Sequence, residues 1–259
     1  MRIESVGLIG GGRVSRILLG GFRATGAIAP KFVVSDPDAE ALARLRETYP
    51  EIIGAGPDNG MPAIQDLVLV ALHPPVMATA LEEIKDSLHT DSVVVSLAPK
   101  ITLARLSELL GGFTRVVRMI PNAPSIIGSG YNPVAFGEGL STKDRATLKE
   151  FFQPLGECPE VEESKLEGYA LLTGMGPTYF WFQLQTLREL GTEFGLEESE
   201  VGPALIQMVN GSARTLLGTE LTPDETMDLI PVRPMADQEA GIQQAYRDRL
   251  SALHAKIKP

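Results

Sequence analysis

Three small residues near the start of the sequence, Gly10, Gly12 and Ser15, have the types and the spacing that can bind a dinucleotide. They occupy the positions of a G-x-G-x-x-G/A pattern in VGLIGGGRVSRILLGGF, residues 6–22. The first glycine permits a tight turn, the second lets the backbone approach a pyrophosphate, and the third position must be small so that helix and strand can touch. Free N–H groups and the helix dipole would then bind the pyrophosphate.

The sequence on both sides of this turn supports the strand and the helix that such a site needs. Upstream is an apolar run of strand length, and downstream the apolar residues recur at the spacing of one helix face, with Gly26 as the expected stop. Arg13, just inside the turn, could offset phosphate charge or be a solvated surface side chain. The alternative for the whole motif is a glycine turn in a βα unit that binds nothing.

Asp36 follows the second predicted strand, residues 31–35, and lies 21 residues beyond Ser15. An acidic residue near this spacing accepts hydrogen bonds from the adenosine ribose, and a carboxylate there favours NAD because it would repel a 2′-phosphate. Asp36-Pro37 also matches a helix N-cap followed by proline at the first helical position. Ribose binding and helix capping therefore both stay open, and so does the choice between NAD(H) and NADP(H).

Strand and helix patterns alternate along the first part of the chain. Further apolar runs of strand length lie at residues 66–72, 92–97 and 115–120. This alternation predicts an α/β fold with a doubly wound, mostly parallel sheet of Rossmann type. Ligands of such sheets bind beyond the carboxyl ends of the strands, so His73, Ala98 and Asn122 are candidate site residues by position.

The pattern changes after residue 159. From residue 164 onward no strand pattern is evident, and we predict helices only. Residues 179–194 are apolar and aromatic nearly all round, which indicates a helix buried on most sides and, in a small domain, burial against another subunit. We therefore predict a dinucleotide-binding domain at residues 1–159 and an all-helical dimerisation domain at residues 160–259.

Composition narrows the class of partner. A net charge of −10 without a Lys/Arg cluster argues against nucleic acid. The single cysteine, Cys158, excludes an internal disulfide and fits a reducing compartment, so we expect a cytoplasmic protein. The histidines lack metal-ligand spacing, no signal peptide is apparent, and no apolar run reaches the ~18 residues of a membrane span. We expect no metal, no nucleic acid and no membrane partner.

Taken together, the motifs resemble the pyrroline-5-carboxylate reductase family. The match runs in order over nearly the whole chain, and besides the glycine turn it includes ALHPPVM (71–77), SLAPKITLARLSELLG (96–111), RMIPNAPSIIGSG (118–130) and LTGMGPTYFWF (172–182). The resemblance implies a Rossmann domain followed by a helical dimerisation domain. It also implies hydride transfer from NADPH or NADH to the C=N bond of a small cyclic imino acid.

The resemblance further implies roles for individual positions. The pyrophosphate and ribose of the cofactor would contact Gly10, Gly12, Arg13, Val14, Ser15, Ser35 and Asp36. The nicotinamide side would be lined by Ala71, His73, Pro74, Ala98 and Asn122. The substrate pocket would be lined by Thr173, Gly174, Met175, Gly176 and Pro177.

Three places depart from the family pattern. The family's S-G-S-G-P block reads Thr-Gly-Met-Gly-Pro at residues 173–177 and has lost one hydroxyl. His73 stands where the family commonly has a lysine, and histidine is a weaker, pH-sensitive cation. The C-terminal substrate loop reads IPVRPM, residues 230–235, with two prolines that cannot donate, no glycine and no hydroxyl. Arg233 in this loop could bind a carboxylate through its guanidinium or form a structural ion pair. The candidate catalytic residues are His73, Thr173 and Arg233, with Arg233 also a candidate for substrate binding.

Three functions stay open on the sequence. The leading one is a homodimeric NAD(P)H-dependent reductase of a small imino or keto acid. The second is a non-catalytic dinucleotide-binding sensor that has lost the substrate loop. The third is an unrelated Rossmann oxidoreductase such as a hydroxyacid dehydrogenase, which is weakened because no lysine of a dehydrogenase-like catalytic helix is evident.

Overall fold

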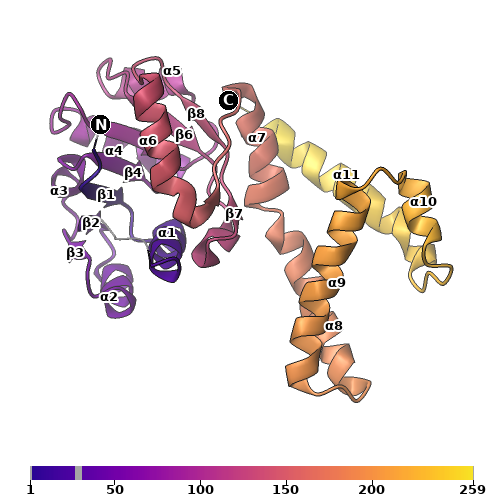
Figure 1. Ribbon diagram of the computed structural model, residues 1–259. Coiled ribbons are helices and arrows are strands. Elements are labelled where there is room, and N and C mark those ends of the chain that lie inside the picture. Colours follow the sequence, from indigo (N-terminus) through magenta and orange to yellow (C-terminus); the bar gives the residue numbers. More distant parts are fainter. Residues whose placement is uncertain (1, 27–30, 259) are drawn as a thin grey trace. The chain divides into compact units, whose positions relative to one another are not determined.

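The computed structural model describes residues 2–26 and 31–258. The chain folds into two compact units, Met1–Met175 with His254–Pro259, and Gly176–Leu253 (Figure 1). The boundary predicted at residue 159 lies inside the first unit. The assignment of residues 160–259 to a dimerisation domain stays a prediction.

A seven-stranded sheet forms the core of the first unit, in the order β3-β2-β1-β4-β5-β6-β8. Its strands are β1 Ser5–Ile9, β2 Lys31–Ser35, β3 Ile53–Gly54, β4 Leu67–Val70, β5 Val93–Ser96, β6 Val116–Met119 and β8 Val134–Phe136. Neighbouring strands are parallel except for the β6–β8 pair. A separate parallel pair joins β7 Gly130–Tyr131 to β9 Gly156–Glu157. The predicted mostly parallel sheet is confirmed, whereas β3, β7, β8 and β9 were not predicted.

Helices connect these strands and cover both faces of the sheet. They are α1 Arg13–Ala24, α2 Ala39–Thr48, α3 Gly60–Ala63, α4 Pro74–Ile84, α5 Leu103–Leu109, α6 Thr142–Phe152 and α7 Leu166–Tyr169. Shorter 3-10 helices span Ala123–Ile127, Gln153–Leu155 and Glu163–Lys165, and a π-helical turn spans Ala170–Gly174.

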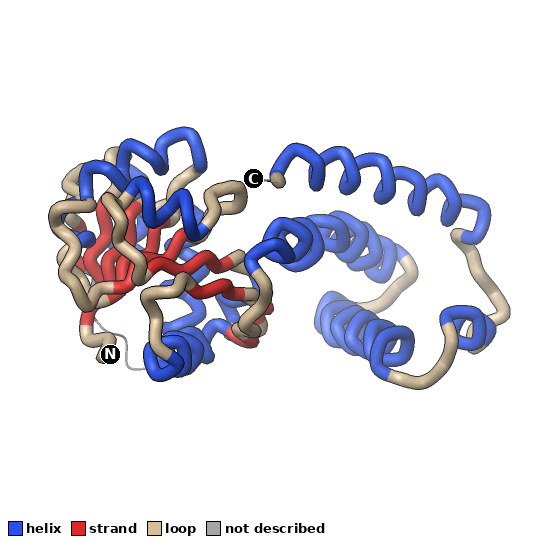
Figure 2. The backbone as a smooth tube through the Cα atoms, turned by 90° about the horizontal axis from the view of Figure 1, so that it is seen from above, coloured by secondary structure: helices blue, strands red, loops and turns tan. Residues whose placement is uncertain are grey.

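Alternate residues of the central strands face opposite sides of the sheet. In β4, Leu67 and Leu69 pack in the apolar cluster formed with α1, α2 and α6, whereas Val68 and Val70 pack in the cluster formed with α4 and α5. All four side chains are fully buried, as expected of a parallel strand that is covered on both faces. Figure 2 shows the strands enclosed between helices on both sides.

Three helices begin with a side-chain cap. Thr102 caps α5, and its hydroxyl accepts from the backbone N–H of Arg105 at 3.1 Å. Ser141 forms a capping box at the start of α6, and Thr222 forms another before the helix that follows it. These side chains satisfy N–H groups that have no partner inside the helix.

The predicted cap at Asp36 is wrong. Helix α2 begins after Asp38, whose carboxylate accepts from the backbone N–H groups of Glu40 and Ala41 at 2.9 and 3.0 Å. Two residues, Pro37 and Asp38, separate Asp36 from the first residue of the helix and leave it too far upstream to cap it. Its carboxylate is used elsewhere, at the glycine turn.

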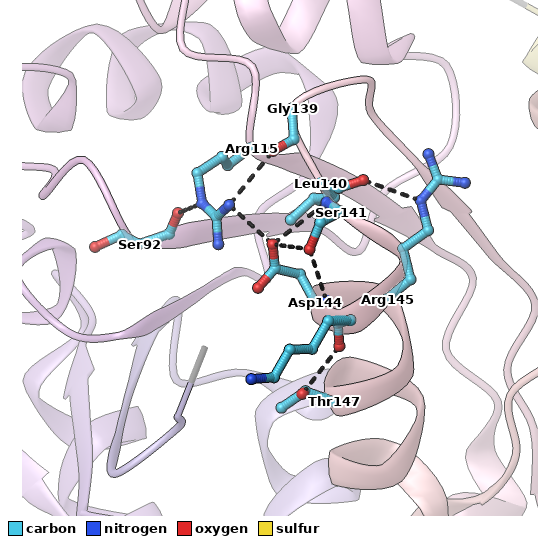
Figure 3. Close-up of polar contacts among 9 residues, drawn as sticks. Ser92, Arg115, Gly139, Leu140, Ser141, Asp144, Arg145 and Thr147 are labelled. Carbon is cyan, nitrogen blue, oxygen red and sulfur yellow. Dashed lines mark hydrogen bonds and ion pairs between the residues drawn. The ribbon is translucent and has the colours of Figure 1, made fainter.

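Arg115 joins the sheet to the start of α6 (Figure 3). Its guanidinium donates to the carbonyl oxygen of Ser92 at 3.2 Å and to Oδ2 of Asp144 at 3.1 Å. The same carboxylate oxygen accepts from the hydroxyl of Ser141 at 2.8 Å. Burial raises the pKa of Asp144, but the hydrogen bonds from Arg115 and Ser141 outweigh it and hold the pKa well below its usual range.

The regular elements described in the second unit are all helices. They are α8 Pro177–Glu193, α9 Glu198–Gly218, α10 Pro223–Asp228 and most of α11 Ala236–Ile257. Helices α8 and α9 approach closely at Gly191, where an added Cβ would lie 3.0 Å from the side chain of Val201. The prediction of helices only is confirmed for residues 164–258. No helix in the described residues is long and apolar enough to cross a membrane.

Helix α8 exposes large aromatic side chains on this single chain. Phe180, Trp181 and Phe182 are each more than half exposed, and Phe194 at its end is 77% exposed. The expected burial of residues 179–194 on most sides does not occur within the chain, because α9 and α11 cover only part of the surface of α8. Burial against another subunit stays a prediction.

Candidate functional site

The glycine turn follows β1, which lies between β2 and β4 in the sheet. Gly10 has φ of 101°, a conformation that side-chain-bearing residues rarely adopt. A Cβ at Gly10 would lie 2.8 Å from the carbonyl oxygen of Ala71. The N–H of Gly10 donates to the carbonyl of Ser35 at 2.8 Å. Position 10 therefore needs glycine for two reasons: the positive φ angle, and the short distance to the backbone of Ala71.

At position 12, neither the backbone angles nor the neighbouring atoms require glycine. Its φ of −77° and ψ of −155° are open to other residues, and an added Cβ would meet nothing within 4 Å. Gly12 is the N-cap of α1, and the first N–H groups of a helix have no acceptor inside it. The open space beside Gly12 and the unpaired backbone N–H groups at the start of α1 fit the binding of a pyrophosphate.

Two of the predicted cofactor residues keep their side chains inside the protein. Ser15 is fully buried and its hydroxyl donates to the carbonyl of Gly10, so the small side chain closes the contact between helix and strand. Ser35 is also fully buried, and its hydroxyl donates to Oδ1 of Asn59 at 2.7 Å. Only the backbone of these two residues can face a ligand. Val14 packs against the core, whereas Arg13 is exposed.

Asp36 fixes the turn to the end of β2. Its Oδ2 accepts from the N–H of Gly11 at 2.7 Å, and its Oδ1 accepts from the N–H of Asp38 at 2.8 Å. A carboxylate can accept about four hydrogen bonds. The position of Asp36 therefore still allows a contact with a ribose hydroxyl.

The nicotinamide-side candidates lie at the same edge of the sheet. The register pairs Ile9 with Val70, Val70 with Ser96, and Ser96 with Arg118, so the residues that follow these positions share the carboxyl edge. Ala71, His73 and Pro74 follow β4, Ala98 follows β5, and Asn122 follows β6. His73 is exposed at the N-cap of α4, whereas Ala98 and Asn122 are buried.

Asn122 ties this edge to the π-helical turn. Its side-chain amide donates to the carbonyl of Thr173, and the hydroxyl of Thr173 donates to the carbonyl of Tyr169 at 2.9 Å. A Cβ on Gly174 would lie 3.2 Å from the side chain of Ile120. Thr173 and Gly174, predicted from a distant motif, therefore lie beside Asn122. π-helical turns occur frequently at functional sites.

A buried ion-pair network, which the sequence analysis missed, supports the same edge. Arg118 is 1% exposed and donates to Glu163 at 2.9 Å and to Glu167. The two glutamates also accept from the backbone N–H groups of Leu103 at 2.7 Å and Lys100 at 3.2 Å. The network thereby joins β6, the start of α7 and the loop after β5. An arginine inside the apolar run 115–120 was the signal that could have revealed it.

Three predicted substrate residues, Gly176, Pro177 and Arg233, belong to the second unit, while Met175 ends the first. Pro177 begins α8, where a missing N–H costs nothing. Arg233 forms an ion pair with Glu239, which is the structural alternative that the sequence left open. A role for these three residues in substrate binding stays a proposal.

Comparison with known proteins gives consistent matches. The family model described as NADP oxidoreductase, coenzyme F420-dependent, matches residues 5–100. The pyrroline-5-carboxylate reductase of Escherichia coli is 27% identical over 228 residues, which covers 88% of this chain and 84% of that protein. The solved pyrroline-5-carboxylate reductase of Coxiella burnetii has a TM-score of 0.69 and 25% identity, covering 98% of this chain and 94% of that one.

A third relative shares the fold. The Plasmodium falciparum pyrroline carboxylate reductase, solved with NADP bound, has a TM-score of 0.74 and 19% identity, covering 99% of this chain and 94% of that one. The matches span both units and include the glycine turn and the segment around Asn122. The chain is therefore similar to pyrroline-5-carboxylate reductases over most of its length.

Proposed function

We propose that this chain is an NAD(P)H-dependent reductase that converts the C=N bond of pyrroline-5-carboxylate to the C–N bond of proline, in the cytoplasm. The observation that carries the proposal is the glycine turn, where Gly12 leaves open space in front of the first N–H groups of α1. The similarity to known proteins supplies the substrate class, because the relatives at 25–27% identity are named for this reduction.

The chain's own residues would act mainly by holding the reactants. The N–H groups at the start of α1 hold the pyrophosphate, and Asp36 reaches the ribose. Ala98, Asn122 and His73 border the nicotinamide. The bound cofactor supplies the hydride. Fixing two reactants in register can lower a barrier by about 7–11 kcal/mol at most, so the chemistry needs little more than position.

Thr173 is our candidate for binding the reacting nitrogen. Its hydroxyl hydrogen is directed to the carbonyl of Tyr169 at 2.9 Å, which leaves the oxygen lone pairs free to accept from the N–H of a protonated imine. A cyclic imine is readily protonated by water, so the transfer needs no strong general acid. His73 is our candidate in the first unit for contacting the substrate carboxylate.

The decisive experiment is a direct assay. Purified protein, pyrroline-5-carboxylate and NADPH or NADH are mixed, and the loss of nicotinamide absorbance is followed. We expect turnover, with a lower kcat/KM for Thr173→Val, because that variant removes the accepting oxygen. Absence of turnover with both cofactors, in protein that binds either of them, would refute the proposal.

The sensor alternative has one observation in its favour. The loop at residues 230–235 contains two prolines that cannot donate, and its arginine is already paired with Glu239. If Arg233 binds the substrate carboxylate, Arg233→Ala raises KM for pyrroline-5-carboxylate at unchanged kcat. An unchanged KM would limit Arg233 to the ion pair. Tight cofactor binding without turnover on a panel of cyclic imines would favour the sensor.

We also propose that the enzyme is a homodimer formed through the second unit. Its support is the exposure of three successive aromatic side chains of α8, Phe180, Trp181 and Phe182, since monomers rarely expose large apolar areas. Sedimentation equilibrium should give twice the mass of 27.9 kDa. Trp181→Glu should shift the equilibrium toward monomer, whereas Arg46→Ala, on an exposed position of the first unit, should not. A monomeric parent chain at micromolar concentration would refute this proposal.

A further inference from the structure

The loop after β5 is held at two points by glutamates from a distant part of the chain. The N–H of Lys100 donates to Oε1 of Glu167 at 3.2 Å. The N–H of Leu103, at the start of α5, donates to Oε1 of Glu163 at 2.7 Å. Lys100 lies two residues after Ala98, the buried residue that we place beside the nicotinamide. The bond to Glu167 therefore holds the part of the loop nearest to Ala98.

Both glutamates are anchored on one buried arginine. Arg118 is 1% exposed, and its guanidinium donates to the same Oε1 atoms, at 2.9 Å for Glu163 and also for Glu167. Arg118 lies in β6 directly opposite Ser96, the last residue of β5. One oxygen of each glutamate thus joins the sheet to the backbone of the loop.

The backbone at Lys100 needs this support. Within residues 2–26 and 31–258, Lys100 is the one residue other than glycine with a positive φ, at 79°. Such a conformation is strained and persists only where the surrounding structure fixes it, and strained residues cluster at functional sites. The hydrogen bond to Glu167 fixes it here. Without this bond, Lys100 is free to return to an ordinary φ, which changes the path of the loop that carries Ala98.

Glu167 is also connected to the substrate side of the site. It lies in α7, which continues directly into the π-helical turn Ala170–Gly174 that contains Thr173. Asn122, after β6, ties the same turn to the sheet, because its side-chain amide donates to the carbonyl of Thr173. Glu167 therefore connects the loop beside the nicotinamide with the turn that we place beside the imine.

We propose that Glu167 is a positioning residue for hydride transfer, which fixes the loop that carries Ala98 relative to the π-helical turn that carries Thr173. The proposal rests on the proposed reductase function and on the places that it gives these two residues. Hydride transfer depends on the distance between the nicotinamide and the imine carbon, and a misplacement of about 1 Å can cost about 100-fold in rate. Glu167 touches neither reactant and acts by holding the backbone of Lys100.

Steady-state kinetics of the full chain, with pyrroline-5-carboxylate and the reduced cofactor that the parent uses, tests this role. Glu167→Ala should lower kcat at least tenfold. Deuterium at the transferred position of the cofactor should slow this variant more than the parent, because hydride transfer becomes the slow step. Glu167→Gln keeps an oxygen that can accept from Lys100 and should stay within threefold of the parent.

Glu163→Ala is the matched control. It removes the other carboxylate partner of Arg118 but leaves the hydrogen bond of Lys100 in place. We expect it to lower kcat less than threefold. An equal loss of kcat in Glu163→Ala and Glu167→Ala would assign the effect to Arg118 and overturn the inference.

A second substitution separates positioning from a loss of stability. Lys100→Gly removes the backbone strain, because glycine adopts a positive φ readily. In the Glu167→Ala background it should raise kcat at least threefold, although it returns no carboxylate to Arg118. If Glu167→Ala fails to fold, Arg118→Met/Glu167→Met removes both buried charges, which apolar residues of similar volume often replace without loss of stability. That variant should lose at least tenfold in kcat.

Calorimetry measures the loop without turnover. It compares the cofactor with the fragment that lacks nicotinamide, ADP-ribose for NADH or its 2′-phosphate for NADPH. In Glu167→Ala the fragment should bind within twofold of its affinity for the parent, because the glycine turn is unchanged. The additional affinity that nicotinamide provides should fall at least threefold.

Unchanged kcat in Glu167→Ala and in Arg118→Met/Glu167→Met, or no gain from Lys100→Gly, would refute the positioning role and leave the reductase standing. A parent that binds the cofactor without turnover would refute the reductase, and the comparison with the fragment would then decide whether Glu167 places the loop. A parent that binds neither the cofactor nor the fragment would refute both.

Discussion

The two glycines of the turn make opposite predictions for folding and for binding. Gly10 has φ of 101°, and a Cβ there would lie 2.8 Å from the carbonyl oxygen of Ala71. Gly12 has an ordinary backbone conformation, and a Cβ there would meet no atom of the chain within 4 Å. We expect Gly10→Ala to impair folding and Gly12→Ala to impair cofactor binding.

The magnitudes follow from these two environments. At Gly10, a strained backbone costs about 1–3 kcal/mol and the forced contact with a backbone oxygen adds about 1–3 kcal/mol, so the free energy of unfolding should fall by at least about 2 kcal/mol. At Gly12, alanine lowers the entropy of the unfolded chain, which stabilises by about 0.4–1 kcal/mol. Alanine is also a poorer N-cap than glycine by about that amount. The two effects cancel to within about 0.5 kcal/mol.

Urea unfolding and calorimetry with NADPH measure both quantities. Gly12→Ala should unfold like the parent chain and bind NADPH at least tenfold more weakly, because its Cβ occupies the space in which the pyrophosphate approaches the N–H groups of α1. If Gly12→Ala binds NADPH as tightly as the parent chain, the start of α1 is not the pyrophosphate site. If Gly10→Ala is as stable as the parent chain, the close approach to Ala71 does not constrain the turn.

Three further predictions concern the framework of the first unit. Asp144→Asn should lower the free energy of unfolding at pH 7 by about 1–3 kcal/mol, since the partly buried guanidinium of Arg115 loses its charged acceptor. Burial raises the pKa of Asp144, yet the hydrogen bond from Arg115 outweighs it and lowers the pKa, so this stabilisation is complete above the ordinary pKa of 3.8 and is lost as the pH falls further. Urea titrations of parent and variant should therefore differ most at neutral pH and converge in acid. Glu167→Ala should lower the free energy of unfolding by about 3–5 kcal/mol in the same assay, because the buried Arg118 then loses one of its two carboxylate partners. Burial raises the pKa of Cys158 to about 12, so its reaction with Ellman's reagent at pH 8 should be at least about 100-fold slower in the native protein than in urea.

Exposed charges supply matched controls for these variants. Glu108 pairs with Arg105 on the surface of α5, so Glu108→Ala should change stability by no more than about 0.5 kcal/mol. A comparable loss in Glu108→Ala and Glu167→Ala would contradict the importance of burial. Persistence of the full Asp144→Asn difference at pH 2 would contradict the pH argument. Fast labelling of native Cys158 would show that the segment around it opens readily.

Local patterns were sufficient for much of the sheet. The strand at Lys31–Ser35 was predicted at its observed bounds, because an apolar run between a loop and an aspartate has few alternatives. The run at residues 66–72 was predicted as a strand of the parallel sheet, and its central residues form β4 and are fully buried. The caps at Thr102 and Ser141 are equally local features, because an N-cap depends on residues only three apart.

Features that depend on distant residues were not predictable in this way. Asp36 and Asp38 are both acceptable caps by type, and the choice between them is made by Gly11, whose N–H captures Asp36. The strand β8 is only three residues long, and it forms because it pairs with β6 in the antiparallel direction. The burial of Ser15 and Ser35 depends on acceptors that only the folded turn brings to them.

The loop after β5 shows why part of the nicotinamide side could not be predicted from local sequence. Lys100 has φ of 79°, a left-handed conformation that costs a residue with a side chain about 1–2 kcal/mol. Its N–H donates to Glu167, which is itself held by the buried Arg118. The strain is stable because residues far apart in the sequence fix both ends of this hydrogen bond. The position of Ala98, two residues before Lys100, is therefore set by an ion pair between β6 and α7, and no window of sequence around the loop contains that information.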